Sequence, residues 1–179
     1  MRRILTFAAL LLFACCYSVG QDYSRLEAFG GFEYLSFDAF GIQRVNLMGW
    51  NGQATYYFHK NFGLTGDIGG AYGSPNLGGF TNHIHTYNFD FGPTVRLSPS
   101  GSTPFFHALF GLTRTDVDSG ALAENGFSFA LGGGYDASLS KTVALRVFQF
   151  DWMHTGYNYP LGNRAQEHVR LSTGLVFKF

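Results

Sequence analysis

The sequence predicts an all-β fold, an eight-stranded antiparallel up-and-down transmembrane β-barrel. Of its 179 residues, 18% are aromatic, 13% are charged and 24 are glycine. Such a composition excludes both a disordered chain and a helical bundle. Hydrophobic residues recur mainly with a period of two, which indicates strands with one apolar and one polar face. The connections between these strands alternate between short and long, as they do in outer-membrane barrels.

The first 20 residues have the pattern of a secretory signal peptide. Arginines at positions 2–3 precede an apolar run over residues 4–16, and small residues follow at 18–20. We expect cleavage after Gly20, which leaves a mature domain of residues 21–179. A membrane anchor is the alternative, but this apolar run is too short to span a bilayer.

Both cysteines, Cys15 and Cys16, lie inside the predicted signal peptide. The mature domain therefore has no cysteine, and neither a disulfide nor a thiolate metal site is expected in it. Residues 12–15 are similar to a lipobox, so lipidation at Cys15 is an alternative, although Phe13 is bulky for that motif. The formal net charge of the whole chain is zero, which argues against binding to nucleic acid.

Eight segments of the mature domain alternate as strands do, and each meets the length of about 9–11 residues that a membrane strand needs. They lie near residues 25–37, 46–58, 62–73, 84–97, 104–115, 126–138, 142–153 and 167–179. The segment 84–97 is the clearest, because Phe89 and Phe91 alternate with Asn88 and Asp90. No apolar run of 18 residues follows residue 20, so no transmembrane helix is expected.

The polar faces of these strands consist mainly of Gly, Ser, Thr and Asn, whereas a soluble sandwich would carry many Lys and Glu there. Small side chains suit the narrow lumen of a small barrel. Aromatic residues also cluster near the strand ends, where their rings would lie at the membrane–water interfaces. These residues are Phe32, Tyr34, Phe37, Tyr56, Tyr57, Phe58, Phe105, Phe106, Trp152, Tyr157 and Tyr159. We therefore expect a monomer in the outer membrane of a Gram-negative bacterium, in contact with outer membrane lipids and lipopolysaccharide.

Charged residues on the predicted polar faces are candidates for a network inside the lumen. The acids are Glu27, Glu33, Asp67, Asp90, Asp136 and Asp151, and the bases are Arg96, Arg146, Arg170 and Lys178. Eight strands leave an interior just wide enough for side chains, and unpaired buried charges are costly. We therefore expect these residues to pair and fill the lumen, which is a structural role. A proton or ion pathway is the alternative.

Two positions interrupt the alternation. Pro93 lies inside a predicted strand and cannot donate a backbone hydrogen bond, so a bulge or local bend is expected there. Arg146 and Gln149 would lie on opposite faces of a regular strand, unless a bulge between them brings both side chains to the same face.

No catalytic residue, cofactor or metal site is expected. A lipid A deacylase of this barrel size carries His and Ser two residues apart, but a glycine stands two residues after His154. His168 and Ser172 would be about 13 Å apart on one strand face, which is too far for a hydrogen bond. His83 and His85 could share a face, but a third metal ligand is not apparent.

The end of the chain resembles a known family. Residues 166–179 are similar to the closing strand of OmpA/OmpX-like outer membrane barrels, with a glycine, alternating apolar residues and a terminal Phe. Residues 143–152 are similar to the penultimate strand of that family, and the resemblance extends over residues 25–179. It implies the barrel fold and implies that the barrel-assembly machinery recognises Phe179. It implies no particular activity, because such barrels host several functions.

The sequence leaves several functions open. The favoured one is a non-enzymatic barrel that stabilises the envelope or mediates adhesion through its long connections. The alternatives are a narrow low-conductance channel, a lipid A-modifying enzyme, and a soluble periplasmic barrel that binds an apolar ligand inside. The soluble barrel would need the alternation to be inverted, with its aromatic side chains pointing inward.

Overall fold

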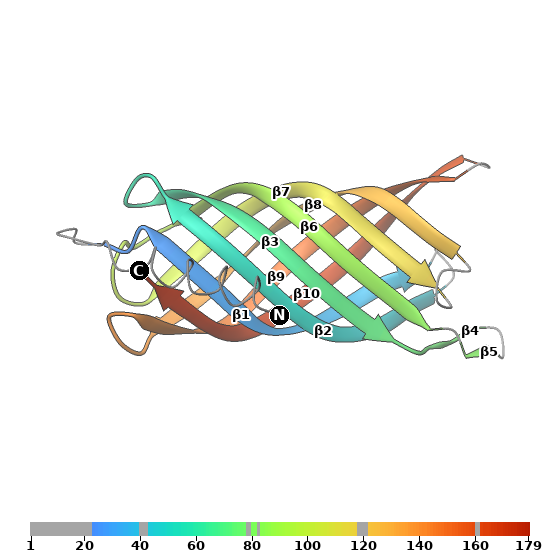
Figure 1. The fold of residues 1–179 in the computed structure, drawn as a ribbon, viewed down its shortest axis with the longest axis horizontal. Coiled ribbons are helices and arrows are strands. Elements are labelled where there is room, and N and C mark those ends of the chain that lie inside the picture. The colour runs from blue at the N-terminus through green and yellow to red at the C-terminus, as the bar shows by residue number, and fades with distance from the viewer. Residues whose placement is uncertain (1–22, 40–42, 78–79, 82, 118–121, 160–161) are drawn as a thin grey trace, which may run out of the picture.

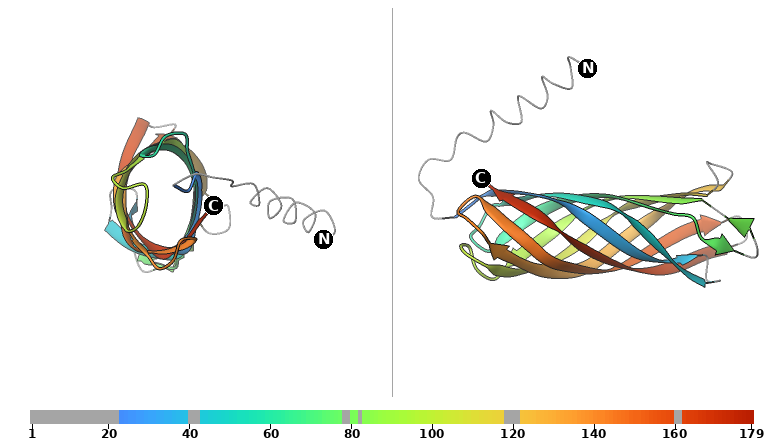
Figure 2. Two further views of the ribbon diagram at one scale, coloured as in Figure 1. Left: turned by 90° about the vertical axis from the view of Figure 1, so that its left-hand side faces the viewer. Right: turned by 90° about the horizontal axis from the view of Figure 1, so that it is seen from below.

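The computed structural model describes residues 23–39, 43–77, 80–81, 83–117, 122–159 and 162–179. The predicted signal peptide and the alternative of lipidation at Cys15 lie outside these residues. The described residues form a barrel that is a closed ring when seen along its axis (Figures 1 and 2). None of them belongs to a helix that is long and apolar enough to cross a membrane.

Eight antiparallel strands make the barrel, as the sequence predicts. They are β1 (Leu26–Ala39), β2 (Gln43–Tyr57), β3 (Phe62–Gly73), β6 (Ile84–Arg96), β7 (Thr103–Val117), β8 (Leu122–Ser138), β9 (Val143–Tyr159) and β10 (Gly162–Lys178). Each pairs with the barrel strand before and after it in the chain, and β1 pairs with β10 to close the ring. In addition, β4 (Asn76–Leu77) and β5 (Phe80–Thr81) form a two-stranded hairpin that was not predicted, between β3 and β6.

Six of the eight barrel strands extend further than predicted at the end with the long connections, whereas β3 and β6 meet that end at the predicted residues. For example, β9 continues to Tyr159 and β10 begins at Gly162, and these two residues are paired. The prediction ended each strand where apolar alternation stops. Backbone pairing does not need apolar side chains, so the hairpins continue past that point (Figure 1).

Apolar side chains cover the outside of the barrel, whereas most of the side chains that line its inside are polar. Phe89 is 63% exposed, whereas the next residue, Asp90, is 4% exposed. Exposed aromatic or large aliphatic residues occur on the outward face of all eight barrel strands. This arrangement suits lipid outside, and it is opposite to the one that a soluble barrel with an apolar interior would need.

The two predicted irregularities have different outcomes. In β9 a bulge at Val147 is confirmed: both β8 and β10 pair with β9 as if that residue were absent. Arg146 and Gln149 are therefore both buried, while Val147 and Phe148 are both exposed. The bulge predicted at Pro93 is wrong, because β6 keeps the same register with β3 and β7 on both sides of it. The missing N–H only interrupts the pairing with β7.

Candidate functional site: the barrel lumen

The structure places most of the predicted charged residues inside the barrel. Those with at most 5% exposure are Glu33, Asp67, Asp90, Arg96, Asp136, Arg146, Asp151 and Arg170. Lys178 is different, because it is only half-buried and its Nζ lies 3.4 Å from the carbonyl oxygen of Gly101 near the short turns. The buried charges thus form the candidate site, and Lys178 lies apart from it.

Arg96 lies at the mouth of the lumen that faces the short turns. Its Nη1 donates to Glu27 Oε1 at 2.7 Å, and its guanidinium lies 3.7 Å from the centre of the Tyr57 ring. Its Nε and Nη2 donate to the backbone carbonyls of Lys60 and Ser24 at 2.8 and 2.9 Å. One guanidinium therefore ties three strands and a turn together and closes this mouth.

Arg146 lies further inside and is held from four directions. Its Nε and Nη2 donate to the two carboxylate oxygens of Asp136 at 2.8 and 3.1 Å, and Nη1 donates to Gln53 Oε1 at 2.6 Å. The guanidinium also lies 4.3 Å from the ring centre of Phe29 and 4.1 Å from that of Phe105. A buried cation between two aromatic faces is stabilised by their quadrupoles as well as by its ion pair.

Arg170 is the centre of the largest group. Its Nη1 and Nη2 donate to both oxygens of Asp67 at 2.9 and 3.1 Å, and its Nε donates to Asp151 Oδ2 at 2.8 Å. Glu33 Oε2 lies 3.7 Å from Nη1. Asp151 is shared with a histidine, because His107 Nε2 lies 2.8 Å from its Oδ1. All these side chains are buried, so the charges compensate one another across the lumen.

Neutral side chains complete the hydrogen bonds of the acids. The amides of Gln53 and Asn88 each donate to Asp67 at 2.6 Å. Asp90 accepts a hydrogen bond from Asn88 at 3.1 Å and a short one from Ser128. Asp67 and Asp90 thus have their hydrogen-bond partners, whereas Glu33 Oε2 has only its 3.7 Å ion pair with Arg170. The satisfied part of such a buried network is rigid and costly to open.

An apolar cluster fills the lumen on the other side of Arg170, towards the long connections. It consists of Leu35, Phe37, Val45, Leu47, Ala71, Ile84, Leu109, Val117, Ala130 and Met153, each at most 7% exposed. Leu35 is paired with Arg170 across β1 and β10, and Phe37 stacks on the His168 ring at 4.5 Å. The lumen therefore contains a layer of paired charges and, towards the long connections, a layer in which the apolar cluster packs. Buried polar side chains also lie in that second part, namely Thr86, Thr113, Thr115, Thr155, Gln166 and His168.

The chain is similar to solved bacterial outer-membrane proteins. Neisserial surface protein A superposes with a TM-score of 0.73 at 13% identity, covering 89% of this chain and 100% of that one. This chain has the fold of a small outer-membrane barrel. The OmpA/OmpX-like type of fold expected from the sequence is thereby confirmed.

Two further solved outer-membrane barrels match less closely. Ail, the attachment invasion locus protein of Yersinia pestis, has a TM-score of 0.49 at 15% identity, covering 89% of this chain and 100% of that one. The N-terminal β-barrel domain of Pseudomonas aeruginosa OprF has a TM-score of 0.49 at 13% identity, covering 88% and 100%. No protein-family model and no curated protein matches the chain.

Several lumen residues of this barrel were missed by the sequence reasoning. Phe37, Tyr57 and Phe105 were expected at the membrane interfaces, but they are at most 3% exposed and point into the lumen. Adjacent strand residues point to opposite faces, so Phe105 and Phe106 cannot both face lipid. The same alternation could have identified His107, which lies two residues after Phe105 on the lumen face.

The chemistry that the lumen side chains could perform depends on how accessible they are. His107, the histidine of the charge network, is 4% exposed and its Nε2 is already bonded to Asp151. Within the described part of the chain, no group of three His, Cys, Asp or Glu residues could hold a metal ion. The lumen side chains of the charge network are therefore bound to one another inside the barrel.

Proposed function

We propose that this chain is a non-enzymatic protein of the bacterial outer membrane whose barrel is sealed, and that it stabilises the envelope or presents its long connections for adhesion. The observation that carries this proposal is the pair of layers in the lumen. A channel would need a continuous polar path. Here the ion pairs of Arg96, Arg146 and Arg170 cross the lumen, and the apolar cluster lies beyond them.

The apolar layer is the stronger barrier to ions. An ion that leaves water for an apolar environment without compensating partners loses hydration energy that nothing there replaces. The charge layer adds a second barrier, because opening it would leave carboxylates such as Asp67 and Asp151 buried without their cation. We therefore favour the sealed barrel over the low-conductance channel.

The outward apolar surface supports a location in lipid. With it we propose export through cleavage of residues 1–20, a mature domain of residues 21–179, and a monomer surrounded by outer membrane lipids and lipopolysaccharide. The C-terminal side chain of Phe179 is 38% exposed and so is accessible to the barrel-assembly machinery, which we propose as a partner during biogenesis. A rigid barrel of this kind would hold the long connections at the cell surface.

Planar-bilayer recording tests the sealed lumen. The protein refolded in detergent is added to a lipid bilayer under voltage, with a large porin as the positive control. We expect no conductance steps above the bare bilayer, because the lumen is filled. Discrete steps from the wild-type protein would contradict the proposal and favour the channel.

A second measurement tests the non-enzymatic part of the proposal. Lipid A extracted from cells that express the protein is compared by mass spectrometry with lipid A from cells carrying an empty vector. We expect identical masses, because the histidine of the charge network, His107, is buried. The exposed Ser74 Oγ and His83 Nδ1 lie 2.8 Å apart and are the pair that a change in mass would implicate. A lost acyl chain or a new substituent would contradict the proposal and favour the lipid A-modifying enzyme.

A further inference from the structure

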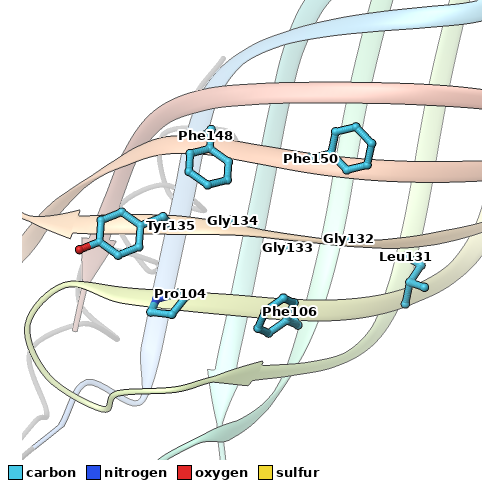
Figure 3. A pocket seen from close by; sticks show the side chains of 9 residues that line it. All are labelled: Pro104, Phe106, Leu131, Gly132, Gly133, Gly134, Tyr135, Phe148 and Phe150. Carbon is cyan, nitrogen blue, oxygen red and sulfur yellow. The ribbon is translucent and has the colours of Figure 1, made fainter.

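A groove of about 610 Å³ lies on the outer face of the barrel, over β8 and between β7 and β9 (Figure 3). The backbone of Gly133 forms its floor. The rings of Phe106 from β7 and of Phe148 and Phe150 from β9 form its walls. This volume is within the range of about 300–1,000 Å³ that is common for ligand pockets, and the lining is apolar.

Two features of the sequence create the groove. Gly133 takes the outward position on β8 where its neighbours Leu131 and Tyr135 carry large side chains, and a Cβ there would lie 2.9 Å from Phe106 Cδ1. The bulge at Val147 makes Phe148 point outward, where a regular strand would place it in the lumen. The missing side chain opens the groove, and the bulge builds one of its walls.

The open end of the groove leads to the short turn between β8 and β9. Tyr135 and Phe148, which are paired, line this end. From Tyr135 the strand continues to Ser138, about 10 Å further at about 3.3 Å per residue. The turn that follows carries Lys141, which is exposed. A cationic side chain therefore lies at the membrane edge directly beyond an apolar groove.

The charges around this edge favour an anionic partner. Lys60 in the turn between β2 and β3 is also exposed, but in the strand order of the barrel this turn lies opposite the groove. The acids described at this end, Glu27 and Asp136, are buried in ion pairs with arginines and so do not offset the exposed lysines. Beside the groove, Lys141 thus presents positive charge towards the lipid headgroups, and one basic residue near an anionic surface contributes about 1 kcal/mol.

We propose that the groove binds one acyl chain of an anionic phospholipid in the leaflet at the short turns, with the lipid phosphate at Lys141. This inference rests on the proposed function, because the groove faces hydrocarbon only when the barrel is in a membrane. The apolar walls suit the chain, and the ammonium suits the phosphate. Tyr135 stands between them, with a ring for the chain and a hydroxyl for the headgroup region.

Native mass spectrometry tests the site. The full chain is placed in nanodiscs of equimolar phosphatidylcholine and phosphatidylglycerol, released in the gas phase, and examined for retained lipid. We expect one phosphatidylglycerol on the wild type, and its loss from Phe148→Ala. Lys141→Gln is expected to keep one bound lipid. Its preference for phosphatidylglycerol over phosphatidylcholine is expected to fall by about fivefold, which is the effect of removing one basic residue. All these side chains are exposed, so we expect the variants to fold, which heat-modified gel migration checks.

Matched controls separate the groove from general lipid contact. Phe89→Ala removes an exposed ring from β6, and Lys60→Gln removes a lysine from another short turn. Both are expected to retain lipid as the wild type does. Equal retention by Phe148→Ala, or equal loss in Phe89→Ala, would overturn the proposal. If the wild type retained phosphatidylcholine and phosphatidylglycerol equally, the proposed preference for an anionic headgroup would be overturned.

Other outcomes distinguish this inference from the proposed function. If the wild type formed a dimer that Phe148→Ala dissociates, a second copy of the chain would occupy the groove. That result would overturn the proposal that a lipid binds there. A protein that enters nanodiscs and does not conduct but retains no lipid would overturn the groove proposal alone. A protein that conducts yet retains phosphatidylglycerol would overturn only the sealed barrel and would support the lipid site.

Discussion

Arg146 and Gln149 are three residues apart on β9, yet Arg146 Nη1 donates to Gln149 Oε1 at 2.7 Å inside the lumen. In a regular strand these two side chains would point to opposite faces. The bulge at Val147 corrects the alternation, and both neighbouring strands pair as if that residue were absent. Because of the bulge, polar residues of β9 such as Arg146 and Gln149 face the lumen on both sides of Val147, and apolar residues face outward.

The bulge gives an unusual prediction for a deletion. Removing Val147 should leave a regular strand in which Arg146 and Gln149 still face the lumen, so the variant is expected to refold into a heat-modifiable barrel. Removing Leu112, which is also exposed but lies in the regular strand β7, should turn the following lumen residues outward and prevent folding. Gel migration before and after boiling measures both. A folded variant without Leu112, or an unfolded one without Val147, would contradict this account.

A second prediction concerns the ion pairs of Arg170. Arg170→Met leaves Asp67 and Asp151 buried without their cation, and we expect a loss of about 3–5 kcal/mol in the free energy of unfolding. Urea titration of the protein in lipid vesicles measures it. The exposed pair of Arg114 and Asp116, with 3.2 Å between Nε and Oδ2, provides the control.

In that control, Arg114→Met is expected to cost less than about 1 kcal/mol, because solvent screens an exposed pair. The readout is the fluorescence of Trp50 and Trp152, whose rings lie on the outer surface, whereas Arg170 points into the lumen. Equal losses in the two variants would show that the lumen charges contribute no more than surface charges do.

The eight strands could be predicted because lipid and lumen impose opposite polarity on alternate residues. The alternation is clear in one segment, where the exposed Phe89 and Phe91 flank the buried Asp90. The strand ends at the long connections could not be predicted in this way. There the pairing of Tyr159 with Gly162 depends on backbone hydrogen bonds, which leave no trace in hydrophobicity.

The members of the lumen network could be predicted better than their pairs. Alternation places Arg170 and Asp67 on the lumen face, but they are 103 positions apart and meet only because the barrel closes. The position of an aromatic residue near a strand end was a poor guide to its face. Phe105 contacts Arg146 inside, whereas its neighbour Phe106 lines the outer groove.

A third prediction concerns the cation–π contact at the mouth of the lumen. Tyr57→Leu removes the ring that lies 3.7 Å from the Arg96 guanidinium, and about 2 kcal/mol of unfolding free energy is expected to be lost from this desolvated contact. Tyr57→Phe keeps the ring and is the matched control. The same urea titration compares them, and an equal loss in both variants would assign the effect to the hydroxyl group instead of the ring.

The last prediction concerns Phe179, whose backbone and side chain have separate roles. Its carbonyl oxygen accepts from the Arg25 amide at 3.1 Å and its amide donates to the Leu26 carbonyl at 2.8 Å, so the backbone helps to close the barrel between β1 and β10. The ring is 38% exposed. Phe179→Ala keeps the backbone bonds, so refolding into detergent should be unchanged, while the yield of assembled barrel in cells should fall severalfold.

The control for Phe179 is Phe177→Ala, which removes a ring with 45% exposure from the same face of β10, two residues earlier. If the assembly machinery recognises the terminal ring, Phe177→Ala should assemble like the wild type. The heat-modifiable protein in the outer membrane fraction, normalised to total protein, measures assembly, and the refolding yield measures intrinsic folding. Parallel losses of assembly and refolding in Phe179→Ala would show that the ring stabilises the barrel itself, and would contradict its role as an assembly signal.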